Sequence, residues 1–150
     1  MKVYRISKTE YAKDLAGTGA KLYGGRWNHV NTPCIYTSES RALAILEYSV
    51  NININFIPNT LTICTFEIDE KQIREIQSDE LPANWKEIPA SHSTKTIGTG
   101  WLQKDVAIIK IPSIVIPDEF NYILNPSQFG TAFQLIEMKR FIYDLRIKKA

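Results

Sequence analysis

Long apolar runs are missing from this 150-residue chain. No stretch approaches the roughly 18 apolar residues that a membrane-spanning helix needs. Met1 leads into the mixed segment 2–6 rather than into a basic stretch followed by an apolar block, which is the pattern of a signal peptide. We therefore expect a cytoplasmic protein with no membrane partner.

Cysteine and histidine are scarce, with two of each. Cys34 and Cys64 lie in apolar segments, where buried free thiols are commoner than a disulfide in a reducing compartment. Only His29 has a cysteine nearby, Cys34 five residues later, and neither histidine lies in a set of His and Cys that would complete a zinc site. The sequence thus predicts neither a metal site nor a prosthetic group.

Strong charge of one sign is also absent, since 18 Lys and Arg oppose 16 Asp and Glu, for a net charge of +2. This balance does not require a polyanionic partner. With 44% hydrophobic and 23% charged residues, the composition is that of an ordinary globular protein rather than a disordered one. We expect one domain over residues 1–150.

Isoleucine is abundant, with 21 residues that often stand in short runs beside Pro, Asn or Gly, and this favours a sheet. The expected strands cover residues 3–6, 35–37, 61–68, 106–111, 114–116, 121–125, 133–139 and 141–146. The expected helices are a short one that opens in a capping box at 7–10, one from Ser38 or Ser40 to about 50, a short surface helix within 69–77, and one over 93–103. A glycine-rich loop is expected over 17–25. Because strands and helices do not strictly alternate, the fold class is α+β.

The first candidate for chemistry is the segment from Gly24 to Asn28. Two glycines before Arg26 let the backbone approach a ligand while the guanidinium reaches a phosphate or carboxylate. The alternative is a tight turn with a surface arginine.

Glu47 is the second candidate, because it is a carboxylate on an otherwise apolar predicted helix. Burying such a group costs several kcal/mol unless it is paired or has a role. An ion pair with Arg5 or Arg41 is the structural explanation. The functional one joins Glu47 to Arg26 and Tyr36: an Arg to hold a phosphate, an aromatic ring to stack a base, and a Glu to stabilise positive charge are what breaking a nucleotide N-glycosidic bond needs.

Two further polar residues stand at turns. Ser113 lies between Pro112 and a second short apolar run, and no Gly-x-Ser-x-Gly motif surrounds it, so it is expected to hydrogen-bond rather than to attack. Asn125 precedes Pro126 in a turn that either orients a loop or reaches a ligand.

Taken together, these segments resemble the RES domain, a family named for an Arg, a Glu and a Ser. The resemblance runs over nearly the whole chain and rests on the order of its pieces, which are Tyr4-Arg5, Gly19-Ala20, Gly24 to Asn28, Tyr36 to Glu39, Ala44 to Glu47, Leu81-Pro82 with Trp85, Ile97-Gly98 with Trp101-Leu102, Pro112-Ser113 and Asn125-Pro126.

The resemblance implies a fold like that of the ADP-ribosyltransferases, in which a split, curved sheet with a few helices holds NAD+ in a cleft. It implies the toxin of a type II toxin–antitoxin system, which degrades NAD+ as its substrate by hydrolysis or phosphorolysis and so arrests growth. The family's catalytic positions fall on Arg26, Tyr36, Glu47 and Ser113. Arg26, Tyr36 and Ser113 are also expected to bind NAD+, together with Arg5 and Asn125.

The expected partner, again by resemblance, is an Xre-type antitoxin with a helix-turn-helix domain that blocks the NAD+ site. Contact with DNA would then be indirect, and a homo-oligomer within the complex stays open. One departure concerns the family's continuation of Asn-Pro with a small residue, His and Pro. Here residues 127–129 are Ser, Gln and Phe, so the chain lacks that histidine.

Two other functions are left open by the sequence. A protein ADP-ribosyltransferase would share every contact to NAD+. A non-catalytic nucleic-acid-binding module is a more distant alternative, suggested by three Trp, seven Tyr and an isoelectric point near 8.5.

Overall fold

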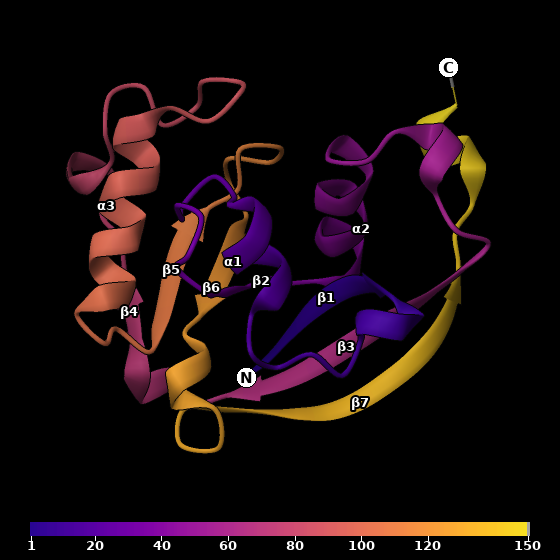
Figure 1. Cartoon of the computed structure of the whole chain (residues 1–150), viewed down its shortest axis with the longest axis horizontal. Helices are drawn as coiled ribbons and strands as arrows, with labels where there is room; N and C mark the ends of the chain where they lie inside the picture. Colours follow the sequence, from indigo (N-terminus) through magenta and orange to yellow (C-terminus); the bar gives the residue numbers. More distant parts are fainter. Residues whose placement is uncertain (150) are drawn as a thin grey trace.

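The computed structural model describes residues 1–149 and is built on a seven-stranded sheet with the order β4-β5-β6-β2-β1-β3-β7 (Figure 1). The strands are β1 Lys2–Lys8, β2 Ile35–Ser38, β3 Thr60–Ile68, β4 Ile73–Glu75, β5 Ile108–Pro112, β6 Phe120–Leu124 and β7 Phe133–Ile142, and the helices are α1 Thr18–Tyr23, α2 Arg41–Val50 and α3 His92–Gln103. Neighbouring strands are antiparallel except β4 and β5, which are parallel. The predicted α+β class is confirmed.

Helices α2 and α3 cover opposite ends of one face of the sheet. Tyr4 of β1 packs in the cluster under α2 and lies opposite Ser38 of β2. Tyr36, two residues before Ser38, packs in the cluster that contains Trp101 of α3. Because side chains alternate along a strand, all these residues share one face. Strands β2 and β6 therefore run between the two helices (Figure 1).

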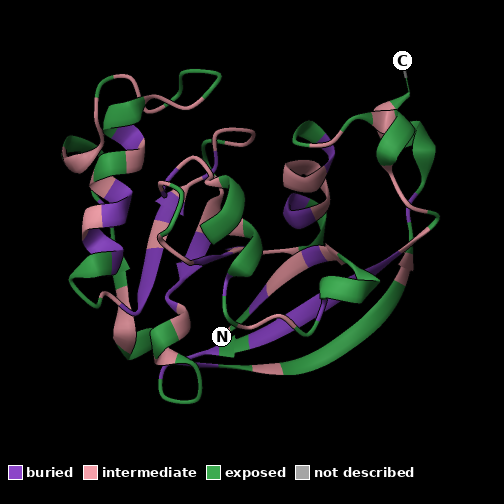
Figure 2. Cartoon of the chain, in the orientation of Figure 1, coloured by how far each residue is buried: buried purple, intermediate pink, exposed green. Residues whose placement is uncertain are grey.

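The other face of the sheet holds a second apolar core. Val3, Phe66, Ile108 and Leu124 are fully buried there. The segment that follows β1 covers this face, and Ala12 packs against the same cluster. Figure 2 shows the contrast between the buried central strands and the exposed edge strand β7.

Helix boundaries follow from polar caps. The Ser40 hydroxyl accepts a hydrogen bond from the Leu43 amide at 3.0 Å and so begins α2, whereas Ser38, the other predicted cap, still belongs to β2. The Ser91 hydroxyl does the same for Thr94 at the start of α3. Both predicted long helices are confirmed.

Two of the predicted helices are wrong. The Ser7 hydroxyl donates to the carbonyl of Lys8 instead of capping a helix, and β1 continues to Lys8 before a single turn of 3-10 helix over Thr9–Tyr11. The expected helix within 69–77 is instead a short 3-10 turn followed by β4. Pairing of β4 with β5 supplies backbone hydrogen bonds that a local pattern does not reveal.

Three other segments also differ from expectation. The predicted loop over 17–25 contains helix α1. Residues 114–116 form a turn, because the Ser113 hydroxyl binds the amides of Val115 and Ile116. The expected strand over 141–146 does not form separately: β7 continues through Ile142, and a 3-10 turn then begins at Leu145.

Both cysteines are buried and free, as expected. Among residues 1–149, no helix is long and apolar enough to cross a membrane.

Candidate active site

Glu47 lies half-buried on α2, and one oxygen of its carboxylate carries its contacts. Oε1 accepts a hydrogen bond from the Ser113 hydroxyl at 2.6 Å and another from Asn121 Nδ2 at 2.7 Å. Within residues 1–149, no hydrogen bond reaches Oε2 and no ion pair includes Glu47. The structural explanation for this residue, an ion pair with Arg5 or Arg41, is therefore wrong.

Ser113 is fully buried and supports Glu47 through its hydroxyl. Its Oγ accepts hydrogen bonds from the amides of Val115 and Ile116 at 3.0 and 3.1 Å. With those acceptor positions used, the single hydroxyl proton is directed to Glu47. The expected direct contact of Ser113 with substrate does not fit this burial, whereas a hydrogen bond to the acid does.

Asn121 is a residue of this cluster that the sequence reasoning missed. It lies on β6 opposite Ser38 of β2, and its Oδ1 accepts a hydrogen bond from the Ser38 hydroxyl at 2.7 Å. The one signal was its residue type, because asparagine is depleted in strands. The Asn121 amide therefore connects Ser38 of β2 with the carboxylate of Glu47, and so joins the sheet to α2.

Arg26 lies in the loop after α1 with its guanidinium partly committed. Nη1 donates to the carbonyl oxygens of Trp85 and Glu87 at 2.9 and 2.8 Å. Nε and Nη2 make no hydrogen bond within residues 1–149, so they are free to bind an anion. Partial burial lowers the pKa of Arg26, while the negative charge of Glu47 opposes that shift. The two groups therefore lie within electrostatic reach of each other without forming an ion pair.

Tyr36 fixes the loop that carries Arg26. Its hydroxyl accepts a hydrogen bond from the Trp27 amide at 3.0 Å and donates one to Asn28 Oδ1 at 2.6 Å. A Cβ at Gly25 would lie 2.6 Å from the same hydroxyl, so this close approach requires glycine. Burial raises the pKa of Tyr36 well above its usual range, which keeps the hydroxyl neutral.

Arg5 does not join this group. It lies on the opposite face of the sheet, over the ring of Phe66 at 5.5 Å. Its Nη2 donates to the carbonyl of Ala12 at 2.9 Å and its Nη1 to that of Asp14 at 3.3 Å. These contacts hold the segment after β1 against the sheet, so the structure does not bring Arg5 to Glu47 as expected.

Asn125 is also separate from Glu47. It follows the end of β6 that is remote from Asn121, and its Nδ2 donates to the carbonyls of Leu102 and Val106 at 3.0 and 3.2 Å. The turn after it, where the family histidine is missing, lies at the same remote end (Figure 1). Its contacts are those of a loop anchor rather than of a site residue.

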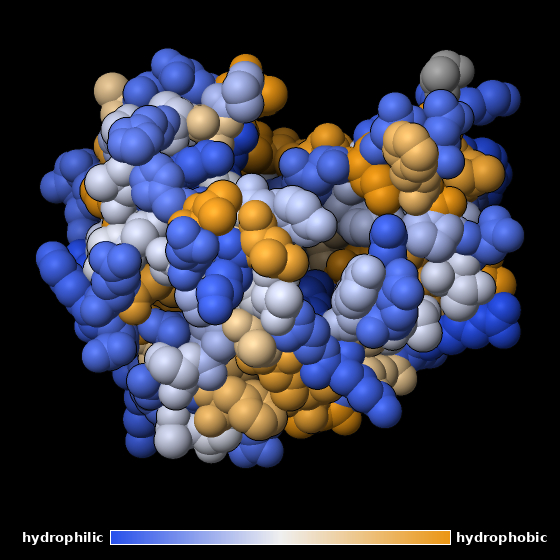
Figure 3. All heavy atoms as spheres, viewed as in Figure 1, coloured by the Kyte–Doolittle hydropathy of each residue, from blue (hydrophilic) through white to orange (hydrophobic). Residues whose placement is uncertain are grey.

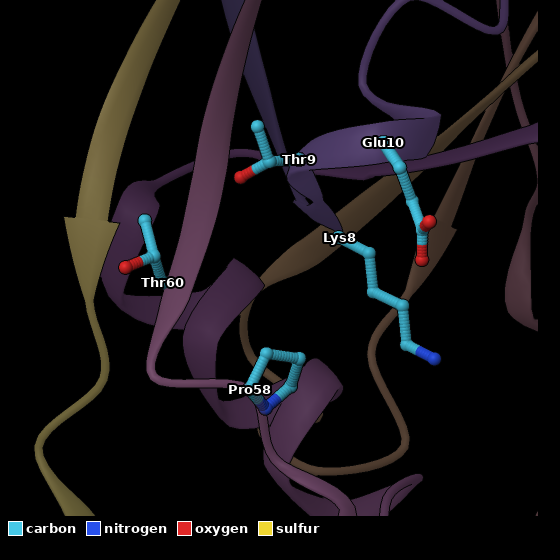
Figure 4. A pocket seen from close by; sticks show the side chains of 5 residues that line it. All are labelled: Lys8, Thr9, Glu10, Pro58 and Thr60. Atoms are coloured by element: carbon cyan, nitrogen blue, oxygen red, sulfur yellow. The ribbon is translucent and has the colours of Figure 1, made fainter.

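Arg26, Tyr36 and Glu47 are all half-buried, so each of them remains partly open to solvent. The space-filling view shows a notch in the molecule between the part built around α3 and the part that carries α2 (Figure 3). Two described hollows lie elsewhere. One of about 190 Å³ is lined by Lys8, Thr9, Glu10, Pro58 and Thr60 (Figure 4), and one of about 360 Å³ extends from the same place along β3 and β7.

The arrangement places a carboxylate with one free oxygen within electrostatic reach of a guanidinium with free donors. A fixed anion in a partly buried place stabilises positive charge that develops next to it. A cation with paired donors binds a phosphate. The structure thus brings Arg26, Tyr36, Glu47 and Ser113 together, adds Asn121, and leaves Arg5 and Asn125 outside.

Comparison with known proteins gives results that extend over the whole chain. Residues 2–145 match the sequence profile of the RES domain. A protein named Toxin Res from Yersinia enterocolitica is 36% identical over 99% of this chain and 100% of its own length. Another of that name from Photorhabdus laumondii is 34% identical over 100% and 99% of the two chains.

A third relative, from a Sphingobium species, is named Prs ADP-ribosylating toxin and is 32% identical over 96% of this chain and 93% of its own. Among solved structures, one of the M. tuberculosis MbcT-MbcA toxin-antitoxin complex aligns with a TM-score of 0.70 over 94% of this chain and 84% of the other. At 14% identity, this likeness concerns the fold alone.

Proposed function

This chain belongs to the RES domain family, and on that basis we propose that it is the toxin of a toxin–antitoxin pair and consumes NAD+ by breaking the bond between nicotinamide and ribose. The observation that carries the proposal is the state of the Glu47 carboxylate. Ser113 and Asn121 hold its Oε1, it forms no ion pair within residues 1–149, and it lies within electrostatic reach of Arg26.

The names of the relatives support the first part of this proposal. Two full-length relatives are named Toxin Res, and a third is named an ADP-ribosylating toxin. ADP-ribosylation draws its ADP-ribose from a dinucleotide with a cationic nicotinamide, and the bond that must break is the one proposed here. All three relatives align over nearly the full length of this chain, so the likeness is not confined to one part of it.

Binding is assigned to Arg26. Its Nε and Nη2 are the free donors of a guanidinium whose Nη1 is anchored on the carbonyls of Trp85 and Glu87. An anchored fork loses little freedom when it takes up a pyrophosphate, because its orientation is already set. Tyr36, next to this loop, offers its ring to the nicotinamide or its ribose and keeps its hydroxyl on Trp27 and Asn28.

Glu47 supplies the chemical step. When the glycosidic bond of NAD+ breaks, its electron pair leaves with nicotinamide, which departs as a neutral molecule, and positive charge develops on the ribose. A carboxylate beside that ribose stabilises the oxocarbenium-like transition state more than the ground state, and so accelerates the reaction. Water then adds to the ribose carbon and loses a proton to solvent, or inorganic phosphate adds and yields the phosphorylated ADP-ribose.

The deciding experiment incubates the purified protein with NAD+, with and without phosphate, and separates the products by chromatography. We expect the Glu47→Gln variant to consume NAD+ about 100-fold more slowly or worse, since it removes one preorganised charge. Glu137→Gln is the matched control, because Glu137 is an exposed glutamate on the edge strand β7. A Glu47→Gln variant as fast as the wild type contradicts the proposed role.

Transfer of ADP-ribose to a protein is the second candidate, and the name of the Sphingobium relative favours it. NAD+ labelled in its adenylate half distinguishes the routes: label retained on a protein supports transfer, whereas free ADP-ribose or its phosphorylated form supports the small-molecule reactions.

An Xre-type antitoxin that covers the notch between α2 and α3 is the partner we propose. The structural relative is described as part of a toxin–antitoxin complex, which supports a protein inhibitor for this chain as well. If a reading frame for such an antitoxin lies next to the gene of this chain, its co-expression with the chain is expected to abolish NAD+ consumption by the purified complex.

A further inference from the structure

A chain of side-chain hydrogen bonds runs from the sheet into the carboxylate of Glu47. A carboxylate only accepts hydrogen bonds, so the amide group of Asn121 must present its Nδ2 to Glu47. Its Oδ1 then faces Ser38, whose hydroxyl is obliged to donate. Both hydrogen bonds therefore donate in the direction of Glu47. Neither the Asn121 amide nor the Ser38 hydroxyl has a second orientation that preserves both bonds.

We propose that Asn121 is a positioning residue for the reaction, and that it selects Oε2 of Glu47 as the oxygen that faces the substrate. The inference rests on the proposed function and names a residue outside the set that the sequence pointed to. Asn121 and Ser113 both donate to Oε1, from two different strand ends. With Oε1 held on both sides, rotation of the carboxylate about its last bond breaks two hydrogen bonds at once.

The placement of Asn121 makes this role specific. Ser38 and Asn121 are paired residues of β2 and β6, so the amide is fixed by the register of the sheet as well as by its own bonds. Glu47, by contrast, stands on α2, which is a separate element packed on that sheet. Asn121 therefore fixes the acid on the helix relative to the sheet. Through Ser38 it also fixes the acid relative to Tyr36, which lies on β2 as Ser38 does.

Two substitutions of Asn121 test the proposal, with NAD+ consumption followed in the purified full-length chain. Asn121→Ala removes one donor to a charged group, and we expect kcat to fall about 10-fold or more while KM changes little, because substrate is held by Arg26. Asn121→Asp keeps the size of the side chain but puts a second carboxylate beside the first, and two carboxylates that share a site do not both ionise easily.

The pH profile is the readout that a merely structural role would not move. We expect the acidic limb of kcat/KM against pH to lie at higher pH in Asn121→Asp than in the wild type, by roughly one unit or more. Asn121→Ala is expected to lie between them. Ser38→Ala, which removes only the bond that orients the amide, is expected to lower kcat less than Asn121→Ala.

Thr37→Val is the matched control for loosening of the strand pair. Thr37 precedes Ser38, and its hydroxyl donates to the carbonyl of Tyr122 on the same partner strand, on the other face of the sheet. It is expected to keep the wild-type kcat and pH profile. If Asn121 variants keep the wild-type kcat, or lose kcat equally at every pH, the positioning role is overturned. If Glu47→Gln also matches the wild type, the proposed function itself fails.

Discussion

Gly98 of α3 lies so close to the backbone of Trp27 that a Cβ at this position would stand 2.1 Å from the Trp27 carbonyl oxygen. The helix is further tied to this loop by the Thr99 hydroxyl, which accepts a hydrogen bond from the His29 amide at 2.9 Å. Trp27 in turn stacks on Trp101 at 5.7 Å. Helix α3 is thus the support against which the loop carrying Arg26 is built.

Substitution of two glycines in α3 should therefore have opposite effects. A methyl group at Gly98 has no room, so Gly98→Ala is expected to displace the loop and to lower the free energy of unfolding by roughly 1–3 kcal/mol or more. At Gly100 a Cβ would meet nothing within 4 Å. Gly100→Ala is expected to raise the free energy of unfolding by about 1 kcal/mol, because alanine is the better helix former. Urea unfolding of both variants tests this, and effects of the same sign would contradict it.

Much of the fold follows from short-range pattern. Strand β5 was predictable because Ile108 and Ile109 belong to a run of β-branched residues that ends at Pro112, and α2 was predictable from Ser40 and the apolar stripe after it. Strand β4 was not, since a three-residue strand exists only through its pairing with β5. The turn after Ser113 was missed because one hydroxyl binding two amides outweighs the β propensity of the residues that follow.

The site was predictable where a residue is unusual for its surroundings. Glu47 on an apolar helix and Arg26 after two glycines both stand out, and the structure brings them together. Asn121 carries only the weak signal of an asparagine in a strand, and nothing but the register of β2 and β6 places it near α2. Arg5 is a basic residue in a strand, and the sequence does not reveal that its guanidinium donates to backbone carbonyls on the opposite face of the sheet.

Removing the hydroxyl of Tyr36 tests whether its hydrogen bonds lock the loop that carries Arg26 in place. Tyr36→Phe leaves the Trp27 amide and Asn28 Oδ1 without the hydroxyl that each contacts, which is expected to cost roughly 1–3 kcal/mol of unfolding free energy. Because the loop then holds Arg26 less firmly, KM for NAD+ is expected to rise more than kcat falls. Tyr23→Phe is the control, since Tyr23 is 82% exposed. An unchanged KM in Tyr36→Phe would argue against the lock.

The buried thiol of Cys34 predicts a loss of stability in alkali. Burial raises its pKa from the usual 9.0 to about 12, so the folded chain keeps the proton while the unfolded chain loses it. The stability contributed by Cys34 is therefore complete below pH 9 and is lost as pH rises toward 12, at roughly 1.4 kcal/mol per pH unit. Between pH 8 and 11, the free energy of unfolding measured in urea should decline more steeply with pH for the wild type than for Cys34→Ala. Parallel declines would show that this thiol is not the cause.

Substituting each of the two arginines that the resemblance associates with NAD+ should have different effects on KM and on the free energy of unfolding. Arg5→Met removes hydrogen bonds to the carbonyls of Ala12 and Asp14 on the face away from Glu47, so we expect a lower free energy of unfolding, by about 1–3 kcal/mol, with KM and kcat close to the wild type. Arg26→Met removes the free donors Nε and Nη2, so we expect KM for NAD+ to rise at least tenfold, the effect of losing about 1.4 kcal/mol of binding. Both variants are assayed at a temperature where unfolding curves show them to be folded. A larger KM effect from Arg5→Met than from Arg26→Met would return Arg5 to the site.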